Sequence, residues 1–522
     1  MNLKKLTRIL FAWLIVFQFG YVNAASLTSL TGNDECTIGV ASGKATPDGR
    51  PLLWKTRDTS ERNNGIIYST SKKYKYIAVN TVGGSTAWMG VNEKGLAILN
   101  SDSSDLPGGS SGPGNGTVMT NALGTCATVD EFQNYLDETN ITGRTTHSNF
   151  GVIDSTGAAA IFETAGSEYW KFDANDSIQA PNGYVLRTNF AFNGAAAEGI
   201  HSGIYSIERY WRQEQLMSDF HSGDSLTYHS ILRYQMRDFS DFDSDPVPVP
   251  YPRTWIPDRP YGYIYCDVSI CRTTSTSAVV FHGVQPQESA KLTTMWTMLG
   301  QPAAAIVVPY WPVGQVPTAA RGTSNAPLCD VALNIRELLF DYAENSSYLD
   351  SYKLRDGLGG GVWTKSFVAE DYIFDEAEQK LNAWRSAGLN VSDMLLTESD
   401  LAGYALTALM DIYQGMISSV EPVAISTTPD DFALLQNYPN PFNASTNFRF
   451  VLPKSSLVQF TIYNALGEQV AAILGRNLDA GQHIFPWSAG TLCSGIYIFQ
   501  LEATPADGSR QFRQALKLQV IK

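Results

Sequence analysis

Residues 36–190 contain eight short segments in which apolar and β-branched residues cluster or alternate between Gly, Pro, Asn and Asp residues. Segments of this length and composition are typical of β-strands joined by tight turns. A succession of such strands must form sheets, and a sheet needs a second layer to bury its apolar face. The segments are CTIGVASG, RPLLWKTRD, KYIAVNTV, TAWMGV, GLAILNSD, NFGVIDS, AAAIFETA and NGYVLRTNF.

Helical periodicity supplies candidates for the covering layers. The first helix is expected within residues 123–139, with Thr128 as its N-cap and Glu131 completing a capping box. The Gly- and Ser-rich residues 106–118 before it are expected to form a surface loop. Further helices are expected at 206–220, 225–239, 331–346, 375–388 and 398–419, with strands at 277–284 and 303–311. The pattern predicts a mixed α+β domain with helices on its sheet faces.

A second unit is expected after a linker. Residues 421–433 lose the helical period and become rich in Thr, Pro and Asp, as is typical of a linker. Residues 434–522 then carry short strands, with a turn at Leu466-Gly467, at the spacing of a small all-β sandwich. We expect the two units to fold independently.

The N-terminus has the pattern of a secretory signal peptide. Lys4, Lys5 and Arg8 precede an apolar run over 9–19, and small residues follow up to Ala25. The alternative, an uncleaved membrane anchor, needs roughly 20 apolar residues, and this run is shorter. We therefore expect residues 1–25 to be removed during export. The sequence shows no later run of comparable apolar length, so no membrane span is expected in the mature chain.

The charge balance argues against a nucleic-acid partner. The 522 residues include 37 Lys and Arg against 51 Asp and Glu, a formal net charge of -14. This charge opposes the electrostatic attraction that dominates nucleic-acid binding. No phosphate-binding or dinucleotide motif follows a strand, and the six His residues lack metal-ligand spacing. We expect neither a cofactor nor a metal.

Export to an oxidising compartment makes disulfides possible among the six Cys residues. Cys266 and Cys271 are close enough in sequence to close a small loop. Cys126 and Cys329 are either a second pair or buried thiols, and the sequence leaves this connectivity open. One further Cys lies in the C-terminal unit, which leaves Cys36 as the odd thiol near the start of the mature chain.

Cys36 has the chemistry of an N-terminal nucleophile if the chain is cleaved after Glu35. One residue would then carry a thiol with a reference pKa of about 8.5 and an α-amine with a reference pKa of about 7.7 to 8.0. The amine can accept the thiol proton and return it to a leaving amine. Residues 26–35, which are polar and lack a hydrophobic period, would be a propeptide. The alternative is a small buried cysteine in a strand.

Four motifs around Cys36 resemble the N-terminal nucleophile (Ntn) hydrolases of the choloylglycine hydrolase and acyl-CoA:6-aminopenicillanate acyltransferase group. They are CT, DGRPLLWKTRD, NEKGLAILN and VLRTNF, and the resemblance runs from Cys36 to about Ile207. It is strongest for the acyltransferase-like linear amide C–N hydrolases. It implies a four-layer αββα sandwich over residues 36–420. It also implies a Cys36 acyl-enzyme that hydrolyses linear amides or transfers their acyl group.

The resemblance also implies roles for individual residues. Cys36 matches the nucleophile, and Asp58 matches the carboxylate that orients the amine. Asn100 and Asn189 match two polar residues that help to hold the amine and the oxyanion. One well-aimed donor to such an oxyanion contributes about 2.7–4 kcal/mol. The alternative for both Asn residues is a turn or strand-end position that bonds its own backbone.

Two further positions match less closely. The bile-salt branch has Arg-Asn before its Asp, whereas this chain has Lys55 and Thr56, which keep the charge but lose the planar bidentate fork. Lys55 is thus a candidate substrate or amine contact, or else a surface Lys. Arg209, in the expected helix 206–220, matches an Arg that supports the nucleophile.

The C-terminal unit resembles a type IX secretion sorting domain. The motifs are LLQNYPNPFNASTNFRFVLP, IYNALGEQV, LDAGQHIFPW and LCSGIYIFQLEA. The resemblance implies the type IX secretion machinery as a partner, with export through the periplasm and release or attachment at the cell surface. The alternative is a carbohydrate-binding or other β-sandwich appendage.

Two rival functions fit the same sequence. The N-terminal Cys dipeptidases share the CT…DG…D opening, so the substrate is either a small-molecule amide or a short peptide. The second rival is a secreted binding or adhesion protein that keeps an inactive hydrolase fold. A secreted chain that still began at Ser26 would favour it.

Overall fold

The computed structural model describes residues 35–195, 204–242, 246–251, 262–322, 326–343, 345–356, 360–418, 432–438, 440, 442, 445–489 and 492–520. The expected signal peptide, residues 26–34 of the expected propeptide and residues 421–431 of the expected linker lie outside these ranges.

Two antiparallel sheets form the centre of the N-terminal part. The six-stranded sheet has the order β10-β1-β2-β12-β13-β14, and the seven-stranded sheet runs in sequence order from β3 to β9. The first comprises β1 (Glu35–Ala41), β2 (Leu52–Asp58), β10 (Tyr184–Arg187), β12 (Ser275–His282), β13 (Thr294–Leu299) and β14 (Val308–Tyr310). The second comprises β3 (Asn64–Ser69), β4 (Tyr76–Thr81), β5 (Met89–Asn92), β6 (Ala97–Asp102), β7 (Ser148–Ile153), β8 (Ala159–Thr164) and β9 (Tyr169–Asp173).

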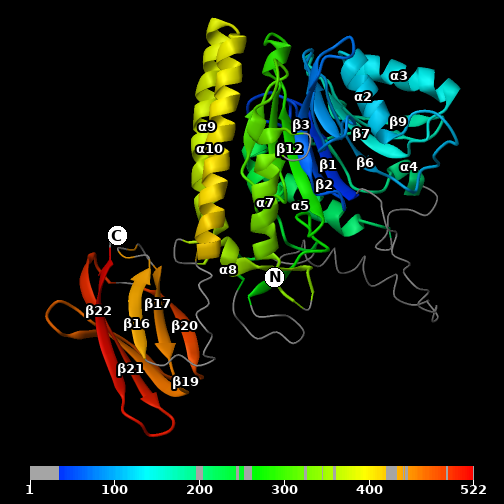
Figure 1. The fold of residues 1–522 in the computed structure, drawn as a ribbon. Helices are drawn as coiled ribbons and strands as arrows, with labels where there is room; N and C mark the ends of the chain where they lie inside the picture. Colours follow the sequence, from blue (N-terminus) through cyan, green and yellow to red (C-terminus); the bar gives the residue numbers. More distant parts are fainter. Residues whose placement is uncertain are drawn as a thin grey trace, which may run out of the picture. The chain divides into compact units, whose positions relative to one another are not determined.

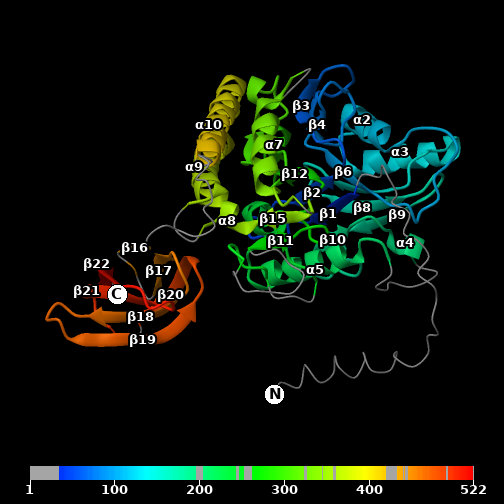
Figure 2. The same ribbon diagram turned by 60° about the horizontal axis from the view of Figure 1, so that its bottom comes forward.

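Helices cover the outer face of each sheet (Figures 1 and 2). α2 (Asn115–Thr125) and α3 (Val129–Thr142) lie on the seven-stranded sheet. On the six-stranded sheet lie α5 (Ile207–Ser222), α7 (Pro327–Leu339), α9 (Val362–Ala387) and α10 (Val391–Ser418). Shorter elements are α4 (Phe192–Ala195), α6 (Tyr228–Ser230), α8 (Ser351–Leu354), and the pair β11 (Tyr263–Tyr265) and β15 (Tyr348–Asp350).

The central strands are buried on both faces. In β6, Leu99 belongs to the core between the two sheets, whereas Ile98 belongs to the core beneath α2 and α3. In β7, Ile153 belongs to the core between the two sheets and Val152 to the core beneath α2 and α3. Successive residues of a strand point to opposite faces, so this division requires a covering layer on each side. The layers follow the order helix, sheet, sheet, helix, which confirms the expected αββα architecture.

The expected N-cap of α3 is confirmed. The Thr128 hydroxyl accepts a hydrogen bond from the backbone N–H of Glu131 at 3.1 Å, and the Glu131 carboxylate accepts one from the backbone N–H of Ala127 at 2.5 Å. The first bond satisfies a donor of the first helical turn, whereas the second differs from the expected capping box because the Glu131 carboxylate binds the residue before the N-cap and not Thr128 itself.

Other expected elements differ from the structure. Helix α2 begins at Asn115, inside the segment expected to be a loop, and the helix expected at 225–239 is reduced to α6 and one π-helical turn over Ile231–Gln235. The strand expected at 303–311 is limited to β14, while β3, β9 and β13 were not expected. All five residues of β9 are half-buried, so this edge strand carries no alternation for a sequence pattern to reveal.

The C-terminal residues form two further antiparallel sheets, of orders β16-β17-β20 and β19-β18-β21-β22. Phe448 packs on Phe460 and Phe499 in a core of their own, which confirms the expected β-sandwich. The turn between β18 and β19 has Gly467 at φ 81°, as expected. The strands are β16 (Ala433–Tyr438), β17 (Ser445–Leu452), β18 (Ser456–Tyr463), β19 (Gln469–Leu478), β20 (Gly481–Ser488), β21 (Gly495–Pro505) and β22 (Phe512–Val520).

Among the described residues, no helix combines the length and apolar character needed to cross a bilayer. The two longest helices, α9 and α10, carry charged residues along their length.

Gly39 provides a test of the packing around β1. It lies opposite Trp54 of β2, and a Cβ at this position would overlap the indole ring. Gly39→Ala should therefore lower the free energy of unfolding by about 1–3 kcal/mol through overpacking. Urea denaturation of both proteins measures this difference.

Gly403→Ala is the matched control. Gly403 is exposed on α10, and a Cβ there meets no atom within 4 Å. This change should raise the free energy of unfolding by roughly 0.5–1 kcal/mol, because Gly loses more backbone entropy than Ala in a helix. Equal midpoints for wild type and Gly39→Ala would contradict the packing described for β1.

Candidate active site

Sheet topology gathers the candidate residues at one edge of the six-stranded sheet. β1 is antiparallel to both β10 and β2, so its start lies beside the ends of those two strands. β12 is antiparallel to β2, so the start of β12 lies at the same edge. Cys36 is the second residue of β1, Asp58 is the last of β2, and Asn189 follows β10 by two positions. These residues, distant in sequence, therefore come together through strand order.

Asn189 binds the backbone nitrogen of Cys36. Its side-chain oxygen Oδ1 accepts hydrogen bonds from Cys36 N at 2.9 Å and from Arg209 Nη2 at 2.8 Å. Both partners are donors, so the atom that faces them must be the amide oxygen. The amide nitrogen Nδ2 donates to the carbonyl oxygen of Asp102 at 3.0 Å. These long-range contacts exclude the alternative in which Asn189 bonds only its own backbone.

Arg209 reaches the same point from α5. Its Nη1 donates to the carbonyl oxygen of Cys36 at 2.9 Å and to Thr37 Oγ1 at 3.0 Å, and lies 3.8 Å from Asp58 Oδ2. The side chain is 3% exposed. An Arg buried to this extent needs carboxylate and carbonyl partners, and these contacts supply them. Arg209 therefore binds both the Cys36 carbonyl and the side chain of the next residue, Thr37.

Asp58 is held by a serine that the sequence analysis did not identify. Asp58 Oδ1 accepts a hydrogen bond from Ser275 Oγ at 2.6 Å. Ser275 opens β12 opposite Asp58, next to an irregularity in the β2–β12 register. A β-bulge at a strand end redirects side chains in this way. Since many serines flank strands in this sequence, no local pattern distinguishes this one.

Lys55 and Asn100 form a second group between the two sheets. Lys55 lies opposite Ile38 in the β1–β2 register, and Cys36 is two residues from Ile38, so all three share one face. Lys55 Nζ donates to Asn100 Oδ1, on the facing sheet, at 2.9 Å. Asn100 Nδ2 donates to Ser148 Oγ of β7 at 3.0 Å.

These contacts decide two alternatives left open by the sequence. Lys55 is fully buried, so it is not a surface Lys. Asn100 is 4% exposed and its side chain hydrogen-bonds Lys55 of β2 and Ser148 of β7, so it is not a turn residue that bonds its own backbone. The structure thus places Cys36 between two groups. The amine-side group is Asn189, Arg209 and Asp58, and the inter-sheet pair is Lys55 with Asn100.

Ser206 also supports the site and carries no sequence signal. Its hydroxyl accepts a hydrogen bond from the backbone N–H of Asn189 at 2.9 Å and donates to Thr188 Oγ1 at 3.0 Å. Ser206 is the residue before α5 and adopts φ 66°. A non-Gly residue in this region is strained by about 1–3 kcal/mol and persists where its contacts hold it. Here those contacts join the turn that bears Asn189 to the helix that bears Arg209.

Among the described residues, Cys126, Cys266, Cys271, Cys329 and Cys493 are free thiols. The small loop considered for Cys266 and Cys271 is therefore not closed by a disulfide. Burial raises the pKa of Cys266 well above its usual value, that of Cys271 to about 12 and that of Cys329 to about 11. These thiols stay protonated at neutral pH, so they are poor nucleophiles.

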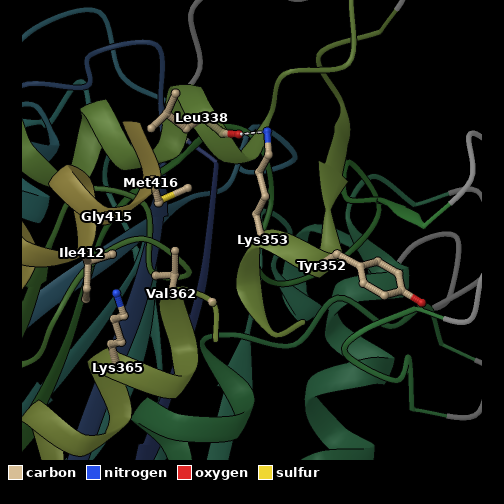
Figure 3. Close-up of a pocket in the computed structure, with 9 residues that line it drawn as sticks. Leu338, Tyr352, Lys353, Val362, Lys365, Ile412, Gly415 and Met416 are labelled. Carbon is tan, nitrogen blue, oxygen red and sulfur yellow. Dashed lines mark hydrogen bonds between the residues drawn. The ribbon is translucent and has the colours of Figure 1, made fainter. Parts of the chain in front are cut away.

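A cavity of about 360 Å³ lies elsewhere, between α7, α8, α9 and α10 (Figure 3). Lys353 Nζ donates to the carbonyl oxygen of Leu338 at 2.8 Å on its rim, and Lys365 lines it from α9. The cavity contains none of the candidate active-site residues. Among the described residues, no cluster of His, Cys, Asp and Glu side chains suited to a metal ion was found.

Residues 45–245 match the family model described as acyl-coenzyme A:6-aminopenicillanic acid acyl-transferase. The matched residues include Asp58, Asn100, Asn189 and Arg209 and begin after Cys36. A search of curated proteins found no match.

Similar solved structures have low identity to this chain. One is a mutant of conjugated bile acid hydrolase from Clostridium perfringens, at 14% identity over 51% of this chain and 89% of that one, with a TM-score of 0.32. Penicillin V acylase from Agrobacterium tumefaciens has 14% identity over 53% of this chain and 86% of its own, with a TM-score of 0.31. The Caenorhabditis elegans ortholog of N-acylethanolamine-hydrolyzing acid amidase has 12% identity over 49% of this chain and 95% of its own, with a TM-score of 0.29. Values this low say nothing of the activity or substrate of this chain.

Asn189→Ala tests the amine-side group. The change removes the oxygen that binds Cys36 N and Arg209. We expect kcat on a cleaved amide to fall on the order of 10² to 10³, as for loss of a positioned polar group at the reacting centre. Steady-state kinetics, with intact mass and a thermal melt of the same sample, measure this.

The control is Asn182→Ala, an exposed Asn just before β10 whose side chain lies 3.5 Å from the Tyr184 hydroxyl. It should leave kcat unchanged. A folded Asn189→Ala enzyme with wild-type kcat would exclude Asn189 from catalysis.

Proposed function

We propose that the protein is a secreted cysteine Ntn hydrolase that cleaves linear amide C–N bonds through a Cys36 acyl-enzyme, or transfers the acyl group to a second amine. The observation that carries this proposal is the binding of Cys36 N by Asn189, beside Arg209 and Asp58. This nitrogen is the atom that chain cleavage would convert into an α-amine. The match of residues 45–245 to an acyltransferase family supports the same class of chemistry.

Processing would begin with attack of the Cys36 thiol on the carbonyl carbon of Glu35. The C–N bond between the two residues breaks, the nitrogen takes the thiol proton, and the Glu35 acyl group is left on sulfur as a thioester. Water then hydrolyses the thioester, which releases the propeptide as an acid and regenerates the thiol. Before this step Cys36 N is an amide and cannot act as a base near neutral pH, so the precursor would be inactive.

Turnover would repeat this chemistry on an external amide. The α-amine of Cys36 takes the thiol proton, the thiolate attacks the substrate carbonyl, and the proton passes to the leaving amine. Asn189 Oδ1 orients the α-amine, and Arg209 fixes the Cys36 backbone. Lys55 and Asn100 line the opposite side of β1, where they are available for the oxyanion or the substrate. The thioester then reacts with water or with a second amine.

Intact mass of the secreted protein tests this proposal. We expect the wild-type chain to begin at Cys36 and to hydrolyse amides. Cys36→Ala should retain Glu35 and the preceding propeptide and show no turnover. Cys36→Ser should be processed slowly, because a hydroxyl is a weaker nucleophile than a thiol.

Cys126→Ala is the control, because this Cys is also buried but lies at the end of α2, and burial raises its pKa. It should be processed and active like the wild type. A wild-type chain that begins at Ser26 and hydrolyses amides at full rate would show that Cys36 is not an N-terminal nucleophile. A chain that begins at Ser26 and hydrolyses none would favour an inactive binding protein.

We also propose that residues 1–25 direct export and that residues 434–522 serve type IX sorting. The support is the N-terminal sequence pattern and the sorting-domain motifs on a β-sandwich with its own core. Deleting residues 434–522 should retain the protein inside the cell and leave the amidase activity of the purified protein intact. Cell fractionation with an activity assay measures both. A folded truncation without activity would show that the two units are not independent.

A further inference from the structure

Glu35, the residue that processing would remove, is bound by two arginines. Its carboxylate forms an ion pair with Arg272, and its Oε2 lies 3.7 Å from Arg209 Nη2. Glu35 also lies directly opposite Asp58 in the β1–β2 register. Two carboxylates at opposed positions repel each other, and the two guanidinium groups offset that repulsion.

Arg272 is built into the site. Its side chain is 16% exposed, and its backbone N–H donates to Ser275 Oγ at 2.9 Å, the same hydroxyl that donates to Asp58. Its Nε is buried without a hydrogen-bond partner among the described residues. Burial lowers the pKa of Arg272 to about 10, which reflects the cost of a charge in this environment.

Removal of Glu35 changes the charge balance of this group. In the unprocessed chain, Glu35 and Asp58 supply two negative charges against the two positive charges of Arg209 and Arg272. After cleavage one carboxylate is gone and an α-amine has been added beside them. A largely buried guanidinium that loses its carboxylate is costly unless another anion takes its place.

We propose that Arg272, with Arg209 beside it, forms a subsite for a carboxylate on the acyl group of the substrate. This inference rests on the proposed function, because it requires cleavage after Glu35 and a Cys36 acyl-enzyme.

The length of the acyl group follows from the processing chemistry. The thioester formed during processing joins the Glu35 carbonyl to Cys36 sulfur, and the thioester formed during turnover joins the substrate acyl carbonyl to that same sulfur. In Glu35, three carbons separate the reacting carbonyl from the carboxylate. The substrate class is therefore amides of a five-carbon dicarboxylic acid, either glutaryl amides or α-glutamyl amides. Turnover of a glutaryl amide breaks its C–N bond, releases the amine with the thiol proton, and then consumes one water to release glutarate.

The wild-type enzyme provides the first test. Glutaryl-4-nitroanilide is compared with the 4-nitroanilide of glutaric acid monoamide, in which an uncharged carboxamide replaces the carboxylate and the leaving group is the same. We expect kcat/KM for the charged substrate to be higher by roughly 10-fold to 100-fold, as for a charge-assisted hydrogen bond. Equal or lower kcat/KM for the charged substrate overturns the subsite.

Arg272→Gln provides the second test. It should lower kcat/KM for the glutaryl substrate by roughly 10-fold to 100-fold, chiefly through KM, and change the uncharged substrate little. Arg50→Gln is the matched control, because Arg50 is also ion-paired, at 13% exposed, but lies at the opposite end of β2. It should leave the ratio between the two substrates unchanged. A wild-type ratio in processed Arg272→Gln overturns the proposal.

The outcomes separate this inference from the proposed function. A chain that begins at Cys36 and cleaves both anilides alike keeps the proposed function and loses the subsite. A wild-type chain that begins at Ser26 overturns both proposals. So does a wild-type chain that, like Cys36→Ala, hydrolyses no amide. If Arg272→Gln is not processed, the comparison of the two substrates on the wild-type enzyme still tests the subsite. Arg272→Lys should keep part of the preference for the charged substrate, because it keeps the positive charge.

Discussion

The site depends on the hydrogen bond between Cys36 N and Asn189 Oδ1, which only the place of β1 in its sheet allows. β1 pairs with β10 on one side and β2 on the other, so Asn189, two positions after β10, and Asp58, the last residue of β2, flank its first residues. Arg209 then fills the outer face and Lys55 the inner one. A one-residue slip in this register would exchange the two faces and separate every one of these contacts.

Buried charge explains why these side chains take their partners from several neighbouring elements. Asp58, Arg209 and Lys55 are all nearly or fully buried, and charges removed from water must be paired or hydrogen-bonded. The partners come from β12, β6 and the backbone of β1 itself. The Glu35 carboxylate meets the same need at the start of β1, where it forms an ion pair with Arg272 and lies 3.7 Å from Arg209.

Most of the fold could be predicted from local patterns, and the misses share a cause. Segments with a clear period or cap, such as α3 with Thr128, were predicted well. Elements whose burial comes from distant neighbours, such as β9 at a sheet edge and β13 between two strands, carry too little local pattern to be recognised. Cys36, Asp58, Asn100 and Asn189 were identified as candidates from the motifs, whereas Ser275, Ser206 and Arg272 lie in no motif and were not.

The sequence by itself determined a strand-rich α+β domain and a separate β-sandwich, because these depend on local period. Its motif resemblance implied the αββα layers and the residue types available for catalysis. Tertiary structure alone decided which groups meet. It placed the oxygen of Asn189 on the Cys36 nitrogen, buried Lys55 against Asn100, and set Arg272 against Glu35. These contacts join residues 45 to 237 positions apart, and such pairings are chosen by sheet register and layer packing, which no local pattern encodes.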